Sequence, residues 1–187
     1  MEFHAIKKSK KETQSNKSDN GAWYLFAFSI MKKSISLKVN GAERSVEVEA
    51  RTTLLDMVRE QFGLTGAKLG CDIQVCGACT LLVDGKPVSA CSVLAVDVDG
   101  AVIETIEGLS TRDKLHPLQE AFMEFGALQC GYCTSGFILT AKALLDECPR
   151  PSEEQIRDYL AGNFCRCGCY QEIMQAIKNV ASGVNSK

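Results

Sequence analysis

Three cysteines lie close together near the middle of the chain, and a fourth follows after eleven residues. The four are Cys71, Cys76, Cys79 and Cys91. This C-x4-C-x2-C spacing with a later fourth cysteine is that of plant-type ferredoxins, in which four thiolates bind a 2Fe–2S cluster. Gly77 and Ala78 separate the second and third cysteines and leave room for backbone N–H groups to approach the negatively charged sulfides. The spacing therefore predicts a 2Fe–2S site.

Zinc and disulfide bonds are the alternatives for such a cysteine-rich loop. Zinc sites usually pair two C-x2-C knuckles or add histidines, and this loop does neither. Ten cysteines in a small chain are also compatible with a secreted disulfide scaffold. However, 45% of the residues are hydrophobic, which is ample for a packed core without disulfides. We therefore favour thiolates that bind iron in a reducing cytoplasm.

A second group of cysteines lies further along the chain, in a C-x2-C pair and a C-x-C pair separated by 31 residues. The four are Cys130, Cys133, Cys165 and Cys167. Both pairs precede expected helices, whose free N–H groups and positive dipole ends suit an anionic thiolate-bound cluster. The chemistry alone leaves zinc open here, and the first site favours a second iron–sulfur cluster.

Two hairpins are expected to hold the first group of cysteines. The first hairpin has strands at 34–39 and 44–49, joined by a turn at Asn40-Gly41. The second has strands at 80–83 and 88–93, joined by a turn at Asp84-Gly85. The return strand of the second hairpin carries Cys91 back beside the other three cysteines. A helix capped by Thr52 or Thr53 and a short strand at 102–105 complete a β-grasp, ferredoxin-like domain over residues 31–107.

A helical period follows, over residues 108–187. Four helices are expected: near 115–125, after Gly136, from the capping box Ser152-x-x-Gln155, and around Ile173 to Val180. This pattern predicts a domain like a four-helix bundle, and an α+β chain as a whole. His116 is interpreted as a capping or solvated residue, and Cys148 as a small apolar filler at a helix end.

The remaining composition limits the function classes. The net charge of −2 excludes a nucleic-acid binder held by bulk electrostatics. Residues 1–30 combine lysines with a short apolar run, as a secretory signal does, but the run begins late and lacks a small-x-small cleavage site. It is also too short to span a bilayer. We expect a flexible N-terminal extension, and Met31 is an alternative natural start.

Three motifs together resemble the small iron–sulfur subunit of the molybdenum hydroxylases, the family of xanthine dehydrogenase, aldehyde oxidase and aerobic carbon monoxide dehydrogenase. The motifs, in order, are Gly70-Cys71-x4-Cys76-Gly-Ala-Cys79-Thr, Gln129-Cys130-Gly-Tyr-Cys133-Thr and Gly162-Asn163-Phe164-Cys165-Arg166-Cys167. The resemblance covers residues 31 to about 182. It implies one 2Fe–2S cluster on each group of four cysteines, a molybdopterin cofactor on a large subunit, and FAD on a further subunit.

The sequence departs from the family pattern at three places. Gln74 stands where the family often has glycine, Ser135 where it often has proline, and Gly168-Cys169 where it usually has Thr-Gly. None of these removes a ligand, but the last places a fifth thiol beside the second cluster. Spacing from Cys165 does not decide between the two later cysteines, and the resemblance assigns Cys167.

The resemblance implies an electron-transfer subunit of an oxidoreductase, with no catalytic residue on this chain. It also implies that Gln129 and Cys167 lie against the pterin of the partner. Two alternatives remain: a free-standing two-cluster ferredoxin that serves diffusing partners, and a zinc-binding scaffold without redox function. Visible absorbance distinguishes the zinc alternative, since a colourless protein would carry no iron–sulfur cluster.

Overall fold

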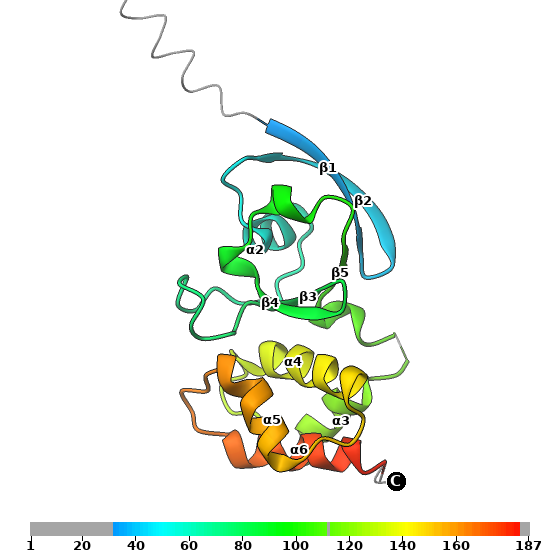
Figure 1. Cartoon of the computed structure of the whole chain (residues 1–187), viewed down its shortest axis with the longest axis vertical. Coiled ribbons are helices and arrows are strands. Elements are labelled where there is room, and N and C mark those ends of the chain that lie inside the picture. The colour runs from blue at the N-terminus through cyan, green and yellow to red at the C-terminus, as the bar shows by residue number, and fades with distance from the viewer. Residues whose placement is uncertain (1–31, 112, 184–187) are drawn as a thin grey trace, which may run out of the picture. The chain divides into compact units, whose positions relative to one another are not determined.

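A five-stranded sheet forms the first half of the described chain, and helices form the second half (Figure 1). The computed structural model describes residues 32–111 and 113–183, which belong to one compact unit. The extension expected at 1–30 lies outside them. Separate sheet and helix regions confirm the α+β class. No helix of the described residues has the length and apolar character needed to cross a membrane.

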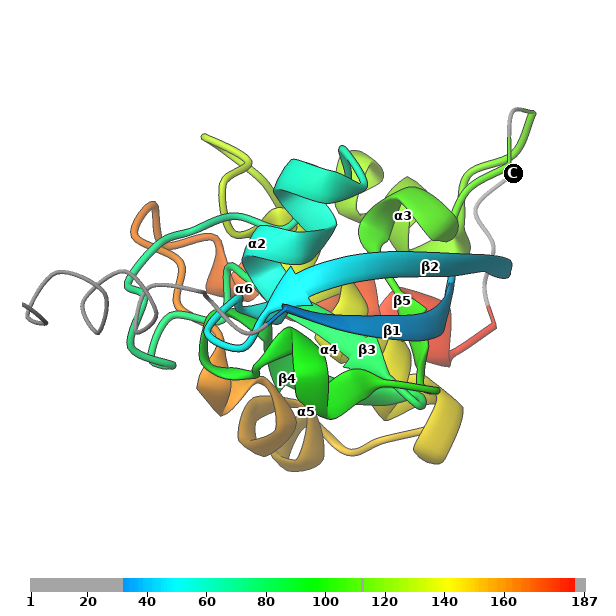
Figure 2. The ribbon, with the colours of Figure 1, turned by 90° about the horizontal axis from the view of Figure 1, so that it is seen from above.

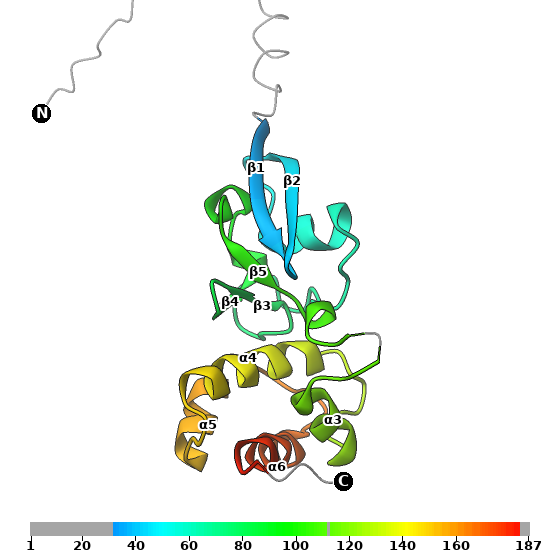
Figure 3. The same ribbon diagram turned by 90° about the vertical axis from the view of Figure 1, so that its right-hand side faces the viewer.

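The sheet is mixed, with the strand order β2-β1-β5-β3-β4. Its strands are β1 (Lys32–Val39), β2 (Ala42–Glu49), β3 (Thr80–Val83), β4 (Lys86–Ser89) and β5 (Val102–Glu104). β1 and β2 pair antiparallel, as do β3 and β4. β5 lies between the two hairpins, parallel to β1 and antiparallel to β3 (Figure 3). The last strand therefore joins the two hairpins into one sheet.

Both hairpin turns form where the sequence predicts them. Asn40 and Gly41 have φ angles of 49° and 83°, and Asp84 and Gly85 have φ angles of 51° and 79°. Positive φ at both central residues is the signature of a type I′ turn, whose twist matches that of the flanking strands. The two dipeptides thus set the register of the strands on either side.

The helix between the hairpins consists of α2 (Leu54–Asp56) and a wider-turned continuation, η1 (Met57–Gln61). Thr53 caps it by accepting a hydrogen bond from the Asp56 N–H, which resolves the choice between two threonines. Its apolar side chains share one buried core with those of β1 and β3. Figure 2 shows α2 beside the β1–β2 hairpin.

The prediction of a strand over 88–93 is correct only for residues 88 and 89 and is wrong for the rest of the range. β4 ends at Ser89, and Cys91 lies in a 3-10 turn, η2 (Ala90–Ser92). The chain leaves the sheet because the next segment bonds to the helix start instead: the Leu54 N–H donates to Val93 O at 2.7 Å, and the Ala95 N–H donates to Thr52 O at 2.8 Å. Cys91 is therefore held by this turn and not by a strand.

The helical half contains five helical segments where the sequence predicted four. They are α3 (Pro117–Glu124), α4 (Thr134–Glu147), α5 (Glu153–Tyr159), η5 (Leu160–Gly162) and α6 (Tyr170–Ala181). α4 lies between β3 and the other helices (Figures 1 and 3). Leu139 and Ala143 belong to the core under the sheet, whereas Phe137 and Ala141 belong to the helical core. α4 is apolar on nearly all sides because both halves pack against it.

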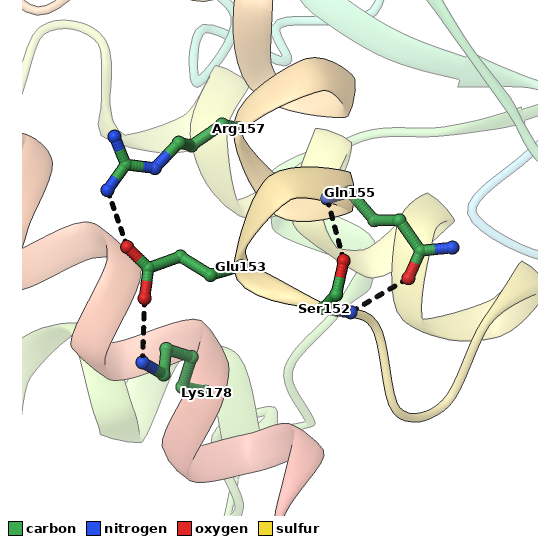
Figure 4. Close-up of polar contacts among 5 residues, drawn as sticks. All are labelled: Ser152, Glu153, Gln155, Arg157 and Lys178. Atoms are coloured by element: carbon green, nitrogen blue, oxygen red, sulfur yellow. Dashed lines mark hydrogen bonds and ion pairs between the residues drawn. The ribbon is translucent and has the colours of Figure 1, made fainter.

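The predicted capping box at Ser152 is confirmed at the start of α5. The Ser152 hydroxyl accepts from the Gln155 N–H at 3.2 Å, and the Gln155 side chain accepts from the Ser152 N–H at 2.8 Å (Figure 4). Glu153 pairs with Arg157 of the same helix and, at 3.0 Å, with Lys178 of α6. These ion pairs are exposed, so they add little to stability and mainly align the two helices.

His116 caps α3, as the sequence suggested. Its Nδ1 accepts a hydrogen bond from the Leu118 N–H at 3.2 Å, and Gln119 completes the capping box. An imidazole can accept at Nδ1 only when that nitrogen carries no proton. Burial, with nearby Lys142, holds the pKa of His116 below its ordinary value, which favours this neutral form.

Acidification is expected to weaken this cap. Because the folded state lowers the pKa of His116, the stabilisation is complete above about pH 6.5 and is lost as the pH falls through the lowered pKa. The His116→Asn variant keeps a capping side chain that does not titrate. Thermal unfolding of both proteins from pH 7.5 to 5.5 should show the wild type losing about 1 kcal/mol more than the variant, the usual worth of a cap. Parallel curves would contradict this.

Candidate metal centres

The first group of cysteines lies on the loop that leads into β3. The Cys71 sulfur accepts hydrogen bonds from the N–H groups of Val75 and Cys76, each at 3.3 Å. Backbone N–H groups, foremost that of Ile73, lower the pKa of Cys71 to about 7. The loop therefore stabilises a thiolate, which is the form that binds metal.

Cys79 and Cys91 form the buried side of this site, with exposed fractions of 2% and 7%. Burial raises the pKa of Cys79 to about 11, and the neighbouring thiol of Cys91 contributes to the shift. A thiol with a raised pKa binds metal only when a cation replaces its proton, which here happens beside a second thiol. This donor set suits a metal centre.

The backbone of the loop is tightly wound. A side chain at Gly70 would place its Cβ 2.7 Å from the Cys76 sulfur. Asp72 and Gln74 have φ angles of 58° and 59°, in the left-handed region that favours glycine. At Gln74, where the family often has glycine, the chain therefore keeps the left-handed conformation at a cost of about 1 kcal/mol.

The second group lies where two loops meet at helix starts. Cys133 is the N-terminal flanking residue of α4, and Cys165 and Cys167 precede α6. Burial, followed by contact with Cys165, raises the pKa of Cys133 to about 12. Contact with Cys167, after a backbone N–H bond from Tyr132, lowers the pKa of Cys130. The four thiols thus come together in two contacting pairs.

Cys169 lies against this second group. It precedes α6, is 2% exposed and packs in the helical core. Burial and the nearby thiols of Cys165 and Cys167 raise its pKa. Cys148 follows α4 and packs at the edge of the same core, as expected of an apolar filler. None of the ten cysteines forms a disulfide.

Neither group is arranged around a single point. Among the described residues, no three or more His, Cys, Asp or Glu side chains are placed to hold one metal ion. A 2Fe–2S cluster has two irons, each bound by two cysteines, so its four ligands need not converge on one position. The pairwise arrangement of the thiols fits such a cluster.

The two groups face a common cavity of about 240 Å³. It is lined by Gly70, Cys71, Cys76, Ala78, Cys130, Tyr132, Cys133, Phe164 and Arg166. Cysteines of both groups therefore border one space, although they are more than fifty residues apart in sequence.

The structure brings Gln129 and Cys167 together at the surface. The Gln129 side-chain N–H donates to the Cys167 carbonyl at 3.5 Å, and both residues are exposed. The sequence also left functional candidates unrecognised. The Tyr170 hydroxyl accepts a hydrogen bond from the Cys165 N–H at 2.8 Å, and its ring packs edge-on against Phe137 at 6.1 Å. The position of Tyr170 shortly after Cys165 and Cys167 was the only sign in the sequence that it contacts the second site.

Family models match both halves of the chain. Residues 37–105 match the 2Fe-2S iron-sulfur cluster binding domain, and residues 105–178 match the [2Fe-2S] binding domain. Fold and donor sets together therefore define a protein with two 2Fe–2S clusters.

Proteins with similar sequences are iron–sulfur or small subunits of oxidoreductases and hydroxylases. The iron-sulfur-binding subunit PaoA of an aldehyde oxidoreductase from Escherichia coli K12 is 46% identical over 167 residues, 81% of this chain and 73% of that protein. The nicotine 6-hydroxylase small subunit of Paenarthrobacter nicotinovorans is 48% identical over 153 residues, 82% of this chain and 92% of that protein.

Among solved structures, quinoline 2-oxidoreductase from Pseudomonas putida 86 has a chain that matches with a TM-score of 0.77 and 47% identity, over 80% of this chain and 93% of its own. Aldehyde oxidoreductase from Desulfovibrio gigas matches with a TM-score of 0.78 and 44% identity, over 82% of this chain but only 17% of its own. The chain belongs to the family of iron–sulfur subunits of molybdenum hydroxylases. It carries two 2Fe–2S clusters as part of an oxidoreductase, and the family implies molybdopterin and FAD on other subunits.

Proposed function

We propose that this chain passes electrons one at a time between a molybdopterin site on a large subunit and a flavin subunit. The observation that carries the proposal is that cysteines of both groups, Cys71 and Cys76 of the first and Cys130 and Cys133 of the second, border one cavity within a single compact unit. Each cluster supplies a one-electron carrier when bound. The chain itself holds the two carriers close together, surrounds them with backbone N–H donors and shields their buried ligands from water.

The ligands in this proposal are the eight cysteines of the two groups. The first cluster is bound by Cys71, Cys76, Cys79 and Cys91, and the second by Cys130, Cys133, Cys165 and Cys167. Two separate hydrophobic cores support a division into a β-grasp domain at 31–107 and a helical, bundle-like domain at 108–187. Ten free thiols support a reducing compartment, the cytoplasm.

The pterin-facing edge in this proposal is formed by Gln129 and Cys167. Their hydrogen bond holds an amide and a backbone segment side by side at the surface of the second site. Both groups are exposed here, so a partner subunit can cover them. We assign no catalytic residue to this chain, because substrate chemistry in this proposal takes place at the molybdopterin site of the large subunit.

Exposed apolar side chains around the cysteine segments support partner subunits over a free-standing ferredoxin. Leu69, Ile73, Val75, Leu128, Tyr132, Phe164 and Tyr170 are each at least 41% exposed. Such a concentration of apolar surface is typical of a protein interface. A ferredoxin active by itself, with no large subunit co-purifying under mild conditions, would contradict the subunit assignment.

Metal analysis tests the cluster content. The protein purified under mild conditions should contain four irons and four acid-labile sulfides per chain, since two clusters of two irons occupy the eight thiols. Two distinct paramagnetic signals should appear on reduction. Two irons per chain, or zinc in place of half of the iron, would refute the second site.

A further inference from the structure

The two cysteine segments of the helical half donate hydrogen bonds to the loop of the first site. Four carbonyl groups of that loop accept them. The bonds are Tyr132 Oη to Leu69 O at 2.7 Å, Ser135 Oγ to Gly66 O at 2.8 Å, Asn163 Nδ2 to Gly77 O at 3.2 Å and Phe164 N to Cys76 O at 2.9 Å. All four donors belong to the helical half, so the contacts orient carbonyls of the loop towards it.

Asn163 is one of two buried side chains among these donors, with an exposed fraction of 8% against 9% for Ser135. Its amide bonds a carbonyl that also accepts from Thr80, through the N–H at 3.2 Å and the hydroxyl at 2.7 Å. The surroundings leave no spare room: a Cβ at Gly77 would lie 2.5 Å from the Asn163 amide nitrogen. The amide is therefore fixed against this one peptide group.

The peptide group between Gly77 and Ala78 lies between two ligands of the first cluster, Cys76 and Cys79. In a trans peptide the C=O and N–H point in opposite directions. When Asn163 holds the carbonyl towards the helical half, the Ala78 N–H points back into the loop that carries the cysteines. A donor at the carbonyl also polarises the peptide and makes its N–H a stronger donor.

We propose that Asn163 positions this peptide and thereby raises the reduction potential of the first cluster, although it lies two residues from a ligand of the second. N–H groups directed at cluster sulfur stabilise the reduced, more negative cluster. The inference rests on the proposed ligand assignment. Asn163 thus acts as a positioning residue that couples one domain to the cluster of the other.

The test is a redox titration of both clusters, followed by paramagnetic resonance, in the wild type and in Asn163→Leu. Leucine has nearly the shape of asparagine but no donor. Cys79→Ser and Cys167→Ser assign each signal, because each should lose a different one. We expect the midpoint potential of the first cluster to become more negative in Asn163→Leu, with a smaller change or none in the second. Loss of the first cluster alone would show that the loop needs Asn163, and the potential is then measured in Asn163→Ser.

Two comparison variants sharpen the result. Thr80→Val removes the other side-chain donor to the same carbonyl, so it should shift the first cluster in the same direction. Asn179→Leu makes the same change on α6 and should shift neither cluster. If Asn163→Leu yields no folded protein, Asn163→Ser, which is too short to reach the carbonyl, is measured instead.

The proposal is overturned if the substitution at Asn163 leaves the first cluster unchanged, or shifts or removes the second cluster as much as the first. This result differs from a failure of the proposed function, which would appear already in the wild type as fewer than four irons and a missing signal.

Discussion

Replacement of Gly136 by alanine should abolish the first cluster, although Gly136 lies in the first turn of α4 and outside both cysteine groups. A Cβ at this position would overlap the carbonyl oxygen of Gly77 in the loop of the first site, and it would lie 3.2 Å from the Asn163 amide nitrogen. Alanine normally stabilises a helix by about 0.5–1 kcal/mol relative to glycine. Here overlap with backbone outweighs that gain, at a cost of about 1–3 kcal/mol. Iron should fall from four towards two per chain.

Gly162→Ala is the matched control. It also lies in the helical half and beside Asn163, but a Cβ there meets nothing within 4 Å. This variant should keep four irons and change stability by no more than about 0.5 kcal/mol. Iron analysis and the two paramagnetic signals are the measurements. A Gly136→Ala protein with both clusters intact would show that the loop and α4 do not need their close contact.

Much of the sheet could be predicted because its signals are local. Asn40-Gly41 and Asp84-Gly85 set two turns through their own backbone preferences, and alternation of apolar residues marked the strands on either side. The end of β4 could not be predicted this way. It depends on Val93 and Ala95 bonding to the helix start, a contact between segments some forty residues apart.

The same distinction holds at the candidate sites. Cysteine spacing is a local signal, and it was enough to propose two groups of ligands. The contacts of Asn163 and Tyr170 depend on how loops from distant parts of the chain meet. A buried asparagine beside a cysteine pair has several uses in a protein, and only the packed structure shows that it donates a hydrogen bond to a carbonyl of the first cysteine loop.

Cys167→Ser should change or abolish the second cluster, whereas Cys169→Ala should leave both clusters in place. Spacing from Cys165 allows either residue as the fourth ligand. The structure distinguishes their environments: Cys167 is exposed on the loop and contacts Cys130, while Cys169 is buried at the start of α6 and packs in the helical core. A thiol fixed at a helix start has its direction set by that helix.

Cys169 lies next to Cys165, so the two substitutions directly test which later cysteine is the fourth ligand. Removal of its sulfur should cost about 1 kcal/mol of packing and leave both paramagnetic signals and four irons. Cys167→Ser should alter one signal, weaken binding of the large subunit through the edge shared with Gln129, and slow electron delivery. If Cys169→Ala destroys a cluster and Cys167→Ser does not, the fourth ligand is Cys169, and the pterin-facing edge must be assigned anew.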